Sequence, residues 1–226
     1  MKRLAKLTIG TTLLAMSASQ AMAADSADVK VAGTIVPPAC VPVIAGGAVF
    51  DYGGIKAASL AMNDYTVLNE MSRDFSITCE SPVKIAIKST DARKDSAVVP
   101  VGKKINSVVV VANDVFSGLG QEDGKNIGGY RMNLNPFSIV LDGNTSVKLD
   151  PIRSSDGKAW SKSSSFWLSD DGMLSSFAVT GSLLPKEFTT LKAKIYVQAA
   201  INKGSELTLT KVNYLNGMTN LQIVYL

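Results

Sequence analysis

The last eight residues, Thr219-Asn-Leu-Gln-Ile-Val-Tyr-Leu226, decide the fold class. Leu221, Ile223 and Tyr225 lie on one face with Asn220 and Gln222 opposite, and this period of two is typical of a β-strand with one buried face. The sequence stops within this strand. Two interpretations follow: the strand is an ordinary last strand, or its sheet is completed by a strand from another chain.

The rest of the chain also reads as short strands separated by turns. No amphipathic helix of ordinary length is present, and only residues 56–62 favour a helical turn. Asp-Gly and Asn-Gly pairs favour tight turns, and many short strands with such turns indicate an all-β sandwich or barrel. Residues 114–128 and 154–165 read as long surface loops. The expected strands are residues 29–36, 48–52, 74–79, 83–88, 107–112, 129–134, 137–141, 147–150, 177–180, 191–200, 206–211 and 219–226.

Residues 1–23 have the pattern of a secretory signal peptide. A basic start precedes an apolar stretch that is too short to span a bilayer, and Ala21-Met-Ala23 fits a cleavage site. We therefore expect an exported, periplasmic protein whose residues 24–226 form one domain without a membrane span. The signal carries three of the 23 Lys and Arg residues, which leaves 20 positive against 19 negative charges. This balance gives no reason to expect nucleic acid as a partner.

The composition argues against several kinds of catalysis. The chain contains no histidine, which excludes Ser-His-Asp and Cys-His catalysis and disfavours a zinc site. We expect no catalytic residue, metal site or cofactor. Two minor alternatives remain open, a sugar site at Trp160 and Trp167 and a carboxylate pair for glycoside chemistry. The acids that would supply this pair are Asp142, Asp150, Asp156, Asp170 and Asp171.

The chain contains two cysteines, Cys40 and Cys79. An even number of cysteines in an exported chain is most simply explained by one disulfide. The alternative, a redox or metal pair, has no nearby CxxC motif or histidine to support it.

The two ends of the chain resemble the subunits of chaperone–usher fimbriae (pilins). Those subunits place a cysteine seven residues after the glycine of their first strand and a second cysteine about 40 residues later, as Gly33, Cys40 and Cys79 do here. They also end in a strand with a penultimate tyrosine, here Tyr225. A closer resemblance is to exported proteins described as β-fimbriae-like, which include the GltF-type periplasmic proteins. Shared features are Gly33–Cys40, the turn Asp51–Gly53 and the ending Tyr225–Leu226.

This resemblance implies a non-enzymatic fimbrial subunit with an immunoglobulin-like Greek-key β-sandwich that lacks its last strand. A periplasmic chaperone fills the resulting groove, and a sister subunit then replaces the chaperone at an outer-membrane usher. Cys40 and Cys79 would tie the first strands together. The terminal strand would form one wall of the groove and contact the chaperone through Leu221, Ile223, Tyr225 and the Leu226 carboxylate. The donor or first strand would contain Val29, Val31, Gly33 and Ile35.

The segment before Gly33 is shorter than in typical pilins. The resemblance therefore also admits a specialised or terminal subunit of the fimbria. The alternative function is that of a soluble periplasmic protein of the same fold, with a complete sandwich and a binding or regulatory role. In that case residues 29–36 would pair with residues 219–226 of the same chain.

Overall fold

A computed structural model describes residues 28–36 and 38–226 of the chain. The predicted signal peptide, residues 1–23, lies outside the described residues. The chain divides into two units, residues 1–36 and residues 37–226. The described part of the first unit, residues 28–36, has no regular secondary structure. The second unit contains every described strand.

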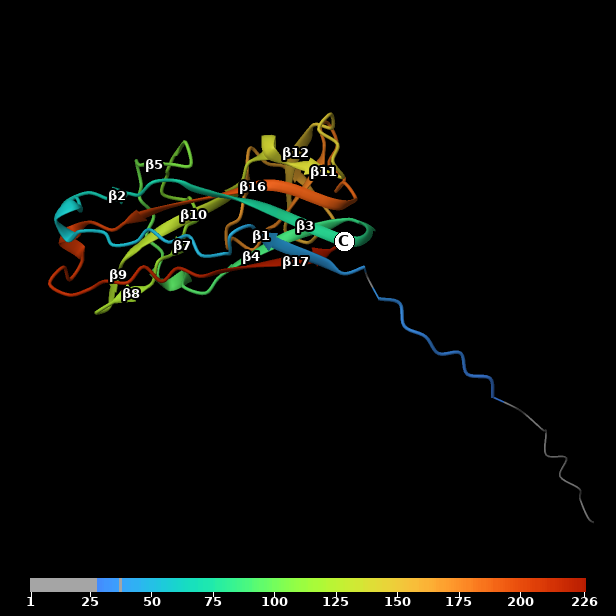
Figure 1. Ribbon diagram of the computed structural model, residues 1–226, viewed down its shortest axis with the longest axis horizontal. Coiled ribbons are helices and arrows are strands. Elements are labelled where there is room, and N and C mark those ends of the chain that lie inside the picture. The colour runs from blue at the N-terminus through green and yellow to red at the C-terminus, as the bar shows by residue number, and fades with distance from the viewer. Residues whose placement is uncertain (1–27, 37) are drawn as a thin grey trace, which may run out of the picture. The chain divides into compact units, whose positions relative to one another are not determined.

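Two antiparallel sheets form the second unit, which confirms the predicted all-β sandwich (Figure 1). The first sheet has the order β1-β3-β16-β10-β14, with three short strands paired to it. Its members are β1 (Cys40–Ile44), β3 (Met71–Val83), β16 (Phe188–Ile201), β10 (Gly128–Leu134), β14 (Phe166–Trp167), β2 (Thr66–Val67), β7 (Ser117–Gly118) and β11 (Val140–Leu141).

The second sheet has the order β13-β12-β15-β4-β17. Its members are β13 (Ser161–Lys162), β12 (Leu149–Ser154), β15 (Leu174–Val179), β4 (Ile85–Asp91) and β17 (Thr219–Tyr225). Two hairpins and four 3-10 turns complete the described elements: β5 (Lys104–Ile105) with β6 (Val108–Val109), β8 (Gln121–Glu122) with β9 (Lys125–Asn126), η1 (Ala57–Ser59), η2 (Lys94–Ser96), η3 (Pro136–Ser138) and η4 (Gly204–Glu206).

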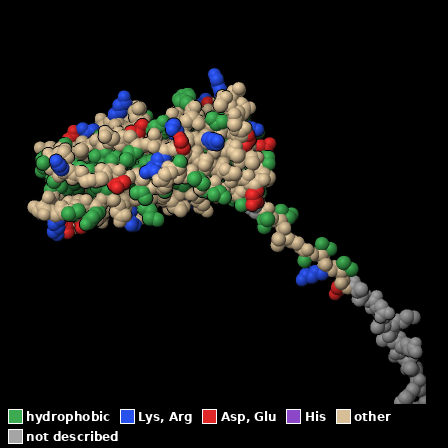
Figure 2. Space-filling view, viewed as in Figure 1, with side chains coloured by type: hydrophobic (Ala, Val, Ile, Leu, Met, Phe, Trp, Pro, Cys, Tyr) green, Lys and Arg blue, Asp and Glu red, His purple; other side chains and the backbone are tan. Residues whose placement is uncertain are grey.

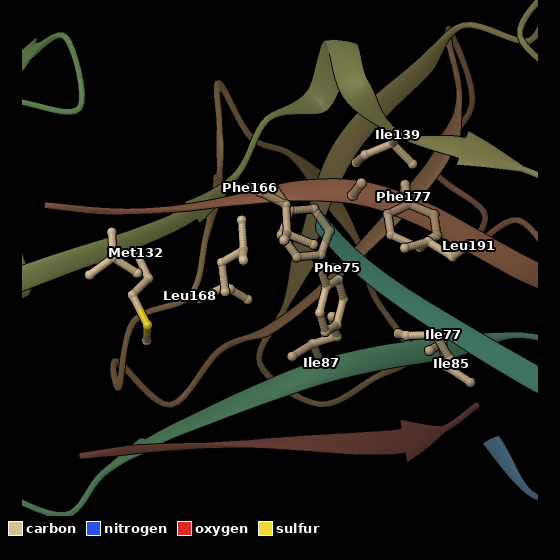
Figure 3. Close-up of a cluster of buried hydrophobic side chains, with 14 of the residues drawn as sticks. Phe75, Ile77, Ile85, Ile87, Met132, Ile139, Phe166, Leu168, Phe177 and Leu191 are labelled. Atoms are coloured by element: carbon tan, nitrogen blue, oxygen red, sulfur yellow. The ribbon is translucent and has the colours of Figure 1, made fainter. Parts of the chain in front are cut away.

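The core lies between the two sheets (Figure 3). Phe75 and Ile77 of β3 and Ile85 and Ile87 of β4 are buried, since alternate side chains of each strand point to the same face. Phe177 of β15 is fully buried in this cluster, where its ring packs against two other phenylalanine rings at centroid distances of 5.6 and 5.8 Å. Since both sheets contribute to one cluster, neither sheet can form its buried face without the other.

The strand order matches six of the seven positions of an immunoglobulin sandwich, in which strands A, B, E and D form one sheet and C, F and G the other. Taken in chain order, β1, β3, β4, β10, β16 and β17 occupy positions A to F. β17 pairs only with β4, and no described strand lies on its other side, where G would be.

Three predicted strands are wrong. Residues 29–36 form no strand, and the first strand begins at Cys40 instead. Residues 48–52 are irregular because Asp51 and Gly53 turn the chain there. Residues 206–211 begin at the end of the 3-10 turn η4 and form no strand before β17. The predicted loop 114–128 is also partly buried, with Phe116 and Leu119 in the core.

Charged side chains are scattered over the face shown in Figure 2 rather than gathered in one basic patch. Among the described residues, no helix has the length and apolar character needed to cross a membrane.

Candidate functional site

The terminal strand β17 has an inner and an outer face. Leu221 and Ile223 are half-buried and pack against the core, while the polar residues between them are more exposed. Tyr225 follows on the same side of the strand and is 38% exposed. Opposite β17, the inward residues Ile85 and Ile87 of β4 are buried. The alternation read from the sequence therefore corresponds to the side-chain directions in the sheet.

The outer edge of β17 has unpaired backbone groups. The N–H of Leu226 donates to Lys84 O, and the N–H of Ala92 donates to Met218 O. Since the direction of the backbone groups alternates along an antiparallel strand, the even-numbered residues of β17 bond to β4. The N–H and C=O groups of residues 219, 221, 223 and 225 consequently point away from β4, toward the position where a further strand would lie.

The other wall of this site is β1, the edge strand of the first sheet. Cys40 lies directly opposite Cys79 of β3, and the two form the predicted disulfide. The two edges meet at one point, where the N–H of Cys40 donates to the hydroxyl of Tyr225 over 2.9 Å. β1 and β17 are otherwise paired to different sheets, so the sandwich is not closed by a ladder between them.

A groove lies at the segments that follow β1 and precede β17 in the chain. Two irregular segments border it, residues 51–60 after β1 and residues 207–215 before β17, and the buried side chains of Ile127 and Ile201 lie at its floor. Its volume is about 730 Å³. Leu207 and Leu215 pack against the core from one border. The groove therefore lies beside the segment that leads into β17, before the strand begins.

Tyr52 holds the first border in place. Asp51 accepts the N–H of Gly53 over 2.8 Å, and this turn directs the Tyr52 side chain toward β16. The Tyr52 hydroxyl accepts the N–H of Ala199 over 3.2 Å and lies 3.5 Å from Val197 O. Burial raises the pKa of Tyr52. The Asp-Tyr-Gly motif was visible in the sequence, but its bond to β16 was not.

A second buried tyrosine stabilises the start of β17. The Tyr130 hydroxyl lies 2.6 Å from Oγ1 of Thr219, which in turn donates to Oγ of Ser117. Burial raises the pKa of Tyr130 as well. These bonds fix the first residue of β17 against β10 and β7.

The residues predicted as donor or first strand lie before β1. Val29, Val31 and Ile35 are 89%, 94% and 103% exposed, and Gly33 shares their irregular segment. These side chains alternate with more polar ones, as the sequence indicated, without forming a strand.

The alternative site residues have local roles. Trp160 donates its indole N–H to Gly157 O, and Trp167 stacks on the buried guanidinium of Arg131 at 4.4 Å. The acids considered for glycoside chemistry accept backbone N–H groups or pair with cations, as Asp171 does with Arg153. Among the described residues, no group of three or more potential ligands is placed to hold a metal ion.

Sequence reasoning missed the cluster around Arg131, which is 5% exposed, lies over the rings of Phe116 and Trp167 and pairs with Asp114 over 2.9 Å. The only indication of this cluster in the sequence was one arginine, Arg131, inside a predicted strand that is otherwise mostly apolar.

Comparisons with known proteins agree with the resemblance to GltF-type proteins. Residues 29–131 match the model of a family described as "Protein of unknown function (DUF1120)". The chain is 27% identical over 237 residues to "Uncharacterized protein YhcF" of Escherichia coli (strain K12), covering 97% of this chain and 98% of the relative. It is also 27% identical over 243 residues to "Protein GltF" of the same organism, covering 94% of each.

Proposed function

We propose that this protein is a non-enzymatic fimbrial subunit that receives a β-strand from another chain. In this function a periplasmic chaperone supplies the strand first, and a sister subunit replaces it during assembly at an outer-membrane usher. The observation that carries the proposal is the unpaired edge of β17, which lies at the sixth position of a seven-strand sandwich and has Leu221 and Ile223 half-buried on its inner face.

Burial of apolar surface favours the addition of such a strand. Leu221 and Ile223 remain half-exposed on the inner face of β17, and each apolar side chain that is fully buried contributes about 1.5–3 kcal/mol before the cost of ordering the strand. The unpaired N–H and C=O groups of β17 add directional bonds, as in other cases of strand addition to a sheet edge.

The proposal assigns a role to each of the remaining predicted residues. The Cys40–Cys79 disulfide fixes β1 beside the groove. Leu226, which directly follows β17, is 43% exposed and would contact the chaperone. Val29, Val31 and Ile35 supply apolar side chains on one face for a neighbouring subunit, with Gly33 between Val31 and Ile35 on that face.

The experiment is to complete the sandwich within one chain. A second copy of residues 28–36 is appended after Leu226 through a short glycine-rich linker, so that it can fold back beside β17. We expect a higher thermal midpoint and less aggregation than in the unextended protein. The matched control carries serine in place of Val29, Val31 and Ile35 of the appended copy, and equal midpoints for the two extended proteins would refute the proposal.

The alternative, a soluble periplasmic protein with a binding or regulatory role, is favoured by one contact. The bond between Cys40 N–H and the Tyr225 hydroxyl joins the two edges without any added strand. This alternative expects the unextended protein to be a stable monomer that gains nothing from the appended strand, so the same experiment distinguishes the two functions.

A further inference from the structure

We propose that Asn216 is a modification site, where spontaneous deamidation of the side-chain amide produces aspartate and isoaspartate. The residue lies in the irregular segment 212–218, directly before β17. The inference goes beyond the proposed function and does not depend on it.

Asn216 is the only asparagine of the chain that a glycine follows. Asparagine is among the thermolabile residues of proteins. In deamidation the backbone nitrogen of the next residue attacks the asparagine Cγ, and a side chain on that next residue hinders the approach. Glycine has no Cβ and reaches the widest range of backbone conformations, so Gly217 presents the least hindered nitrogen.

Both reacting groups are accessible. Asn216 and Gly217 are exposed and belong to no helix or strand. The N–H of Asn216 donates to Leu119 O over 2.9 Å, which attaches the segment to the rest of the unit. The N–H of Gly217 has no backbone acceptor among the described residues, so its nitrogen is not held back from the attack by such a bond.

Comparable side chains elsewhere are held by hydrogen bonds or ion pairs. Asn213, in the same segment, donates its amide N–H groups to Thr208 O and Lys211 O. The four Asp-Gly pairs could form the same cyclic intermediate, but each carboxylate has a partner: Asp123 with Lys211, Asp142 with Thr190 N–H, Asp156 with Lys158 N–H and Asp171 with Arg153. The Asn216 side chain has no such partner among the described residues.

An open hollow of about 470 Å³ lies beside Asn216. Gly120 lines it as well, and a Cβ added there would lie 3.6 Å from Cβ of Asn216. Because Gly120 has no side chain, the Asn216 amide has room to turn toward the Gly217 nitrogen. The hollow also admits water to the reacting carbon.

The reaction needs water as its only co-reactant. The Gly217 nitrogen loses its proton to hydroxide and forms a bond to Cγ of Asn216. The bond between Cγ and the side-chain nitrogen then breaks, and this nitrogen takes a proton from water and leaves as ammonia. Water opens the resulting succinimide ring. Addition at the side-chain carbonyl gives aspartate, and addition at the backbone carbonyl gives isoaspartate, without any change of oxidation state.

Isoaspartate would disturb the start of β17, because it lengthens the backbone by one carbon atom at a closely packed point. A Cβ on Gly217 would lie 2.5 Å from Cε1 of Tyr130 and 3.1 Å from Gly118 O. The Tyr130 hydroxyl in turn lies 2.6 Å from Oγ1 of Thr219, the first residue of β17. We therefore expect isoaspartate to loosen this attachment, whereas aspartate, which keeps the backbone length, should affect it less.

The test is to age the folded exported protein in neutral and in mildly alkaline buffer. Peptide mass spectrometry measures the deamidated fraction at each asparagine, and enzymatic methylation of the free α-carboxylate measures isoaspartate. We expect Asn216 to deamidate about tenfold or more faster than any other asparagine, since its neighbour alone lacks a Cβ. The rate should increase with pH, because the attacking nitrogen must lose its proton.

The matched control is Asn216→Gln, whose longer side chain forms the cyclic intermediate far more slowly. The thermal midpoint of the aged protein should fall as isoaspartate accumulates, while aged Asn216→Gln should keep its midpoint. Asn216→Asp, which adds the charge without lengthening the backbone, should lower the midpoint less than isoaspartate does.

Two results would overturn the inference. One is that Asn216 stays intact in the folded protein while it deamidates in the same protein in urea, which would mean that the fold protects it. The other is deamidation at similar rates across several asparagines. A midpoint that stays unchanged at high isoaspartate content would overturn the effect inferred for β17.

Discussion

Replacing Tyr52 with phenylalanine should destabilise the protein through one hydroxyl group. Tyr52→Phe keeps the ring but removes the acceptor of the Ala199 N–H, which is bonded to the hydroxyl over 3.2 Å. Ala199 is fully buried. Along β16, the pairing with β3 ends at Val197 and the pairing with β2 begins at Ala200, so neither strand accepts the Ala199 N–H. The variant thus leaves a buried donor without a partner.

The expected cost is about 1–3 kcal/mol, the usual penalty for a buried unsatisfied polar group. For a chain of this length, each kcal/mol lowers the thermal midpoint by about 2–4 °C. Urea unfolding followed by tryptophan fluorescence measures the free energy directly. The matched control is Tyr214→Phe, since Tyr214 is 68% exposed and should change stability by less than about 0.5 kcal/mol.

The same variant makes a prediction for alkaline pH. The pKa of Tyr52 is raised above its ordinary value of 10.0 by burial, so the folded state keeps the phenol neutral. Its contribution to stability is fully present below pH 10 and is lost as the pH rises from there toward the folded pKa. Tyr52→Phe should therefore show a shallower alkaline decline than the unmodified protein. Equal stability of Tyr52→Phe and the Tyr214→Phe control at neutral pH, with equal alkaline slopes, would refute the role given to this hydroxyl.

Three further changes can be measured in the same assays. Replacing both Cys40 and Cys79 with serine removes a crosslink between residues 39 apart and should cost about 4 kcal/mol in the chain-entropy model, so a loss under about 1 kcal/mol would contradict it. Gly118→Ala should destabilise strongly, because the new Cβ would lie 2.1 Å from Arg93 O, whereas alanine at an exposed position serves as the control. Phe177→Ala should cost about 3–5 kcal/mol through the cavity it leaves between the sheets, and a well-folded variant with unchanged unfolding free energy would show that this ring is not central to the core.

Local patterns predicted the long strands well. β3, β4, β10, β16 and β17 follow runs of alternating or apolar residues, and their pleat fixes which side chains are buried. The cysteine pair was also predicted correctly. Residues 29–36 and 48–52 have the same alternation, yet neither forms a strand. Alternation shows that a segment is able to pair, but the partner that makes it a strand lies elsewhere in the sequence or in another chain.

The edges of the sandwich were beyond the reach of sequence patterns. That β17 has a free edge, and that its Tyr225 bonds to Cys40 of β1, 185 residues away, depends on how the strands are placed in the two sheets. The Tyr52 bond to β16 is equally long-range.

The sequence by itself determined an all-β chain, its disulfide and the inner face of the terminal strand, because these follow from side-chain period and residue type. Only the tertiary structure decided that β17 is an edge strand and that it meets β1 through the bond between Tyr225 and Cys40. Nearly every residue type carries the same backbone N–H and C=O groups, so the sequence does not show which of these groups are paired. Which edge lacks backbone hydrogen bonds is known only once the strands are placed beside one another.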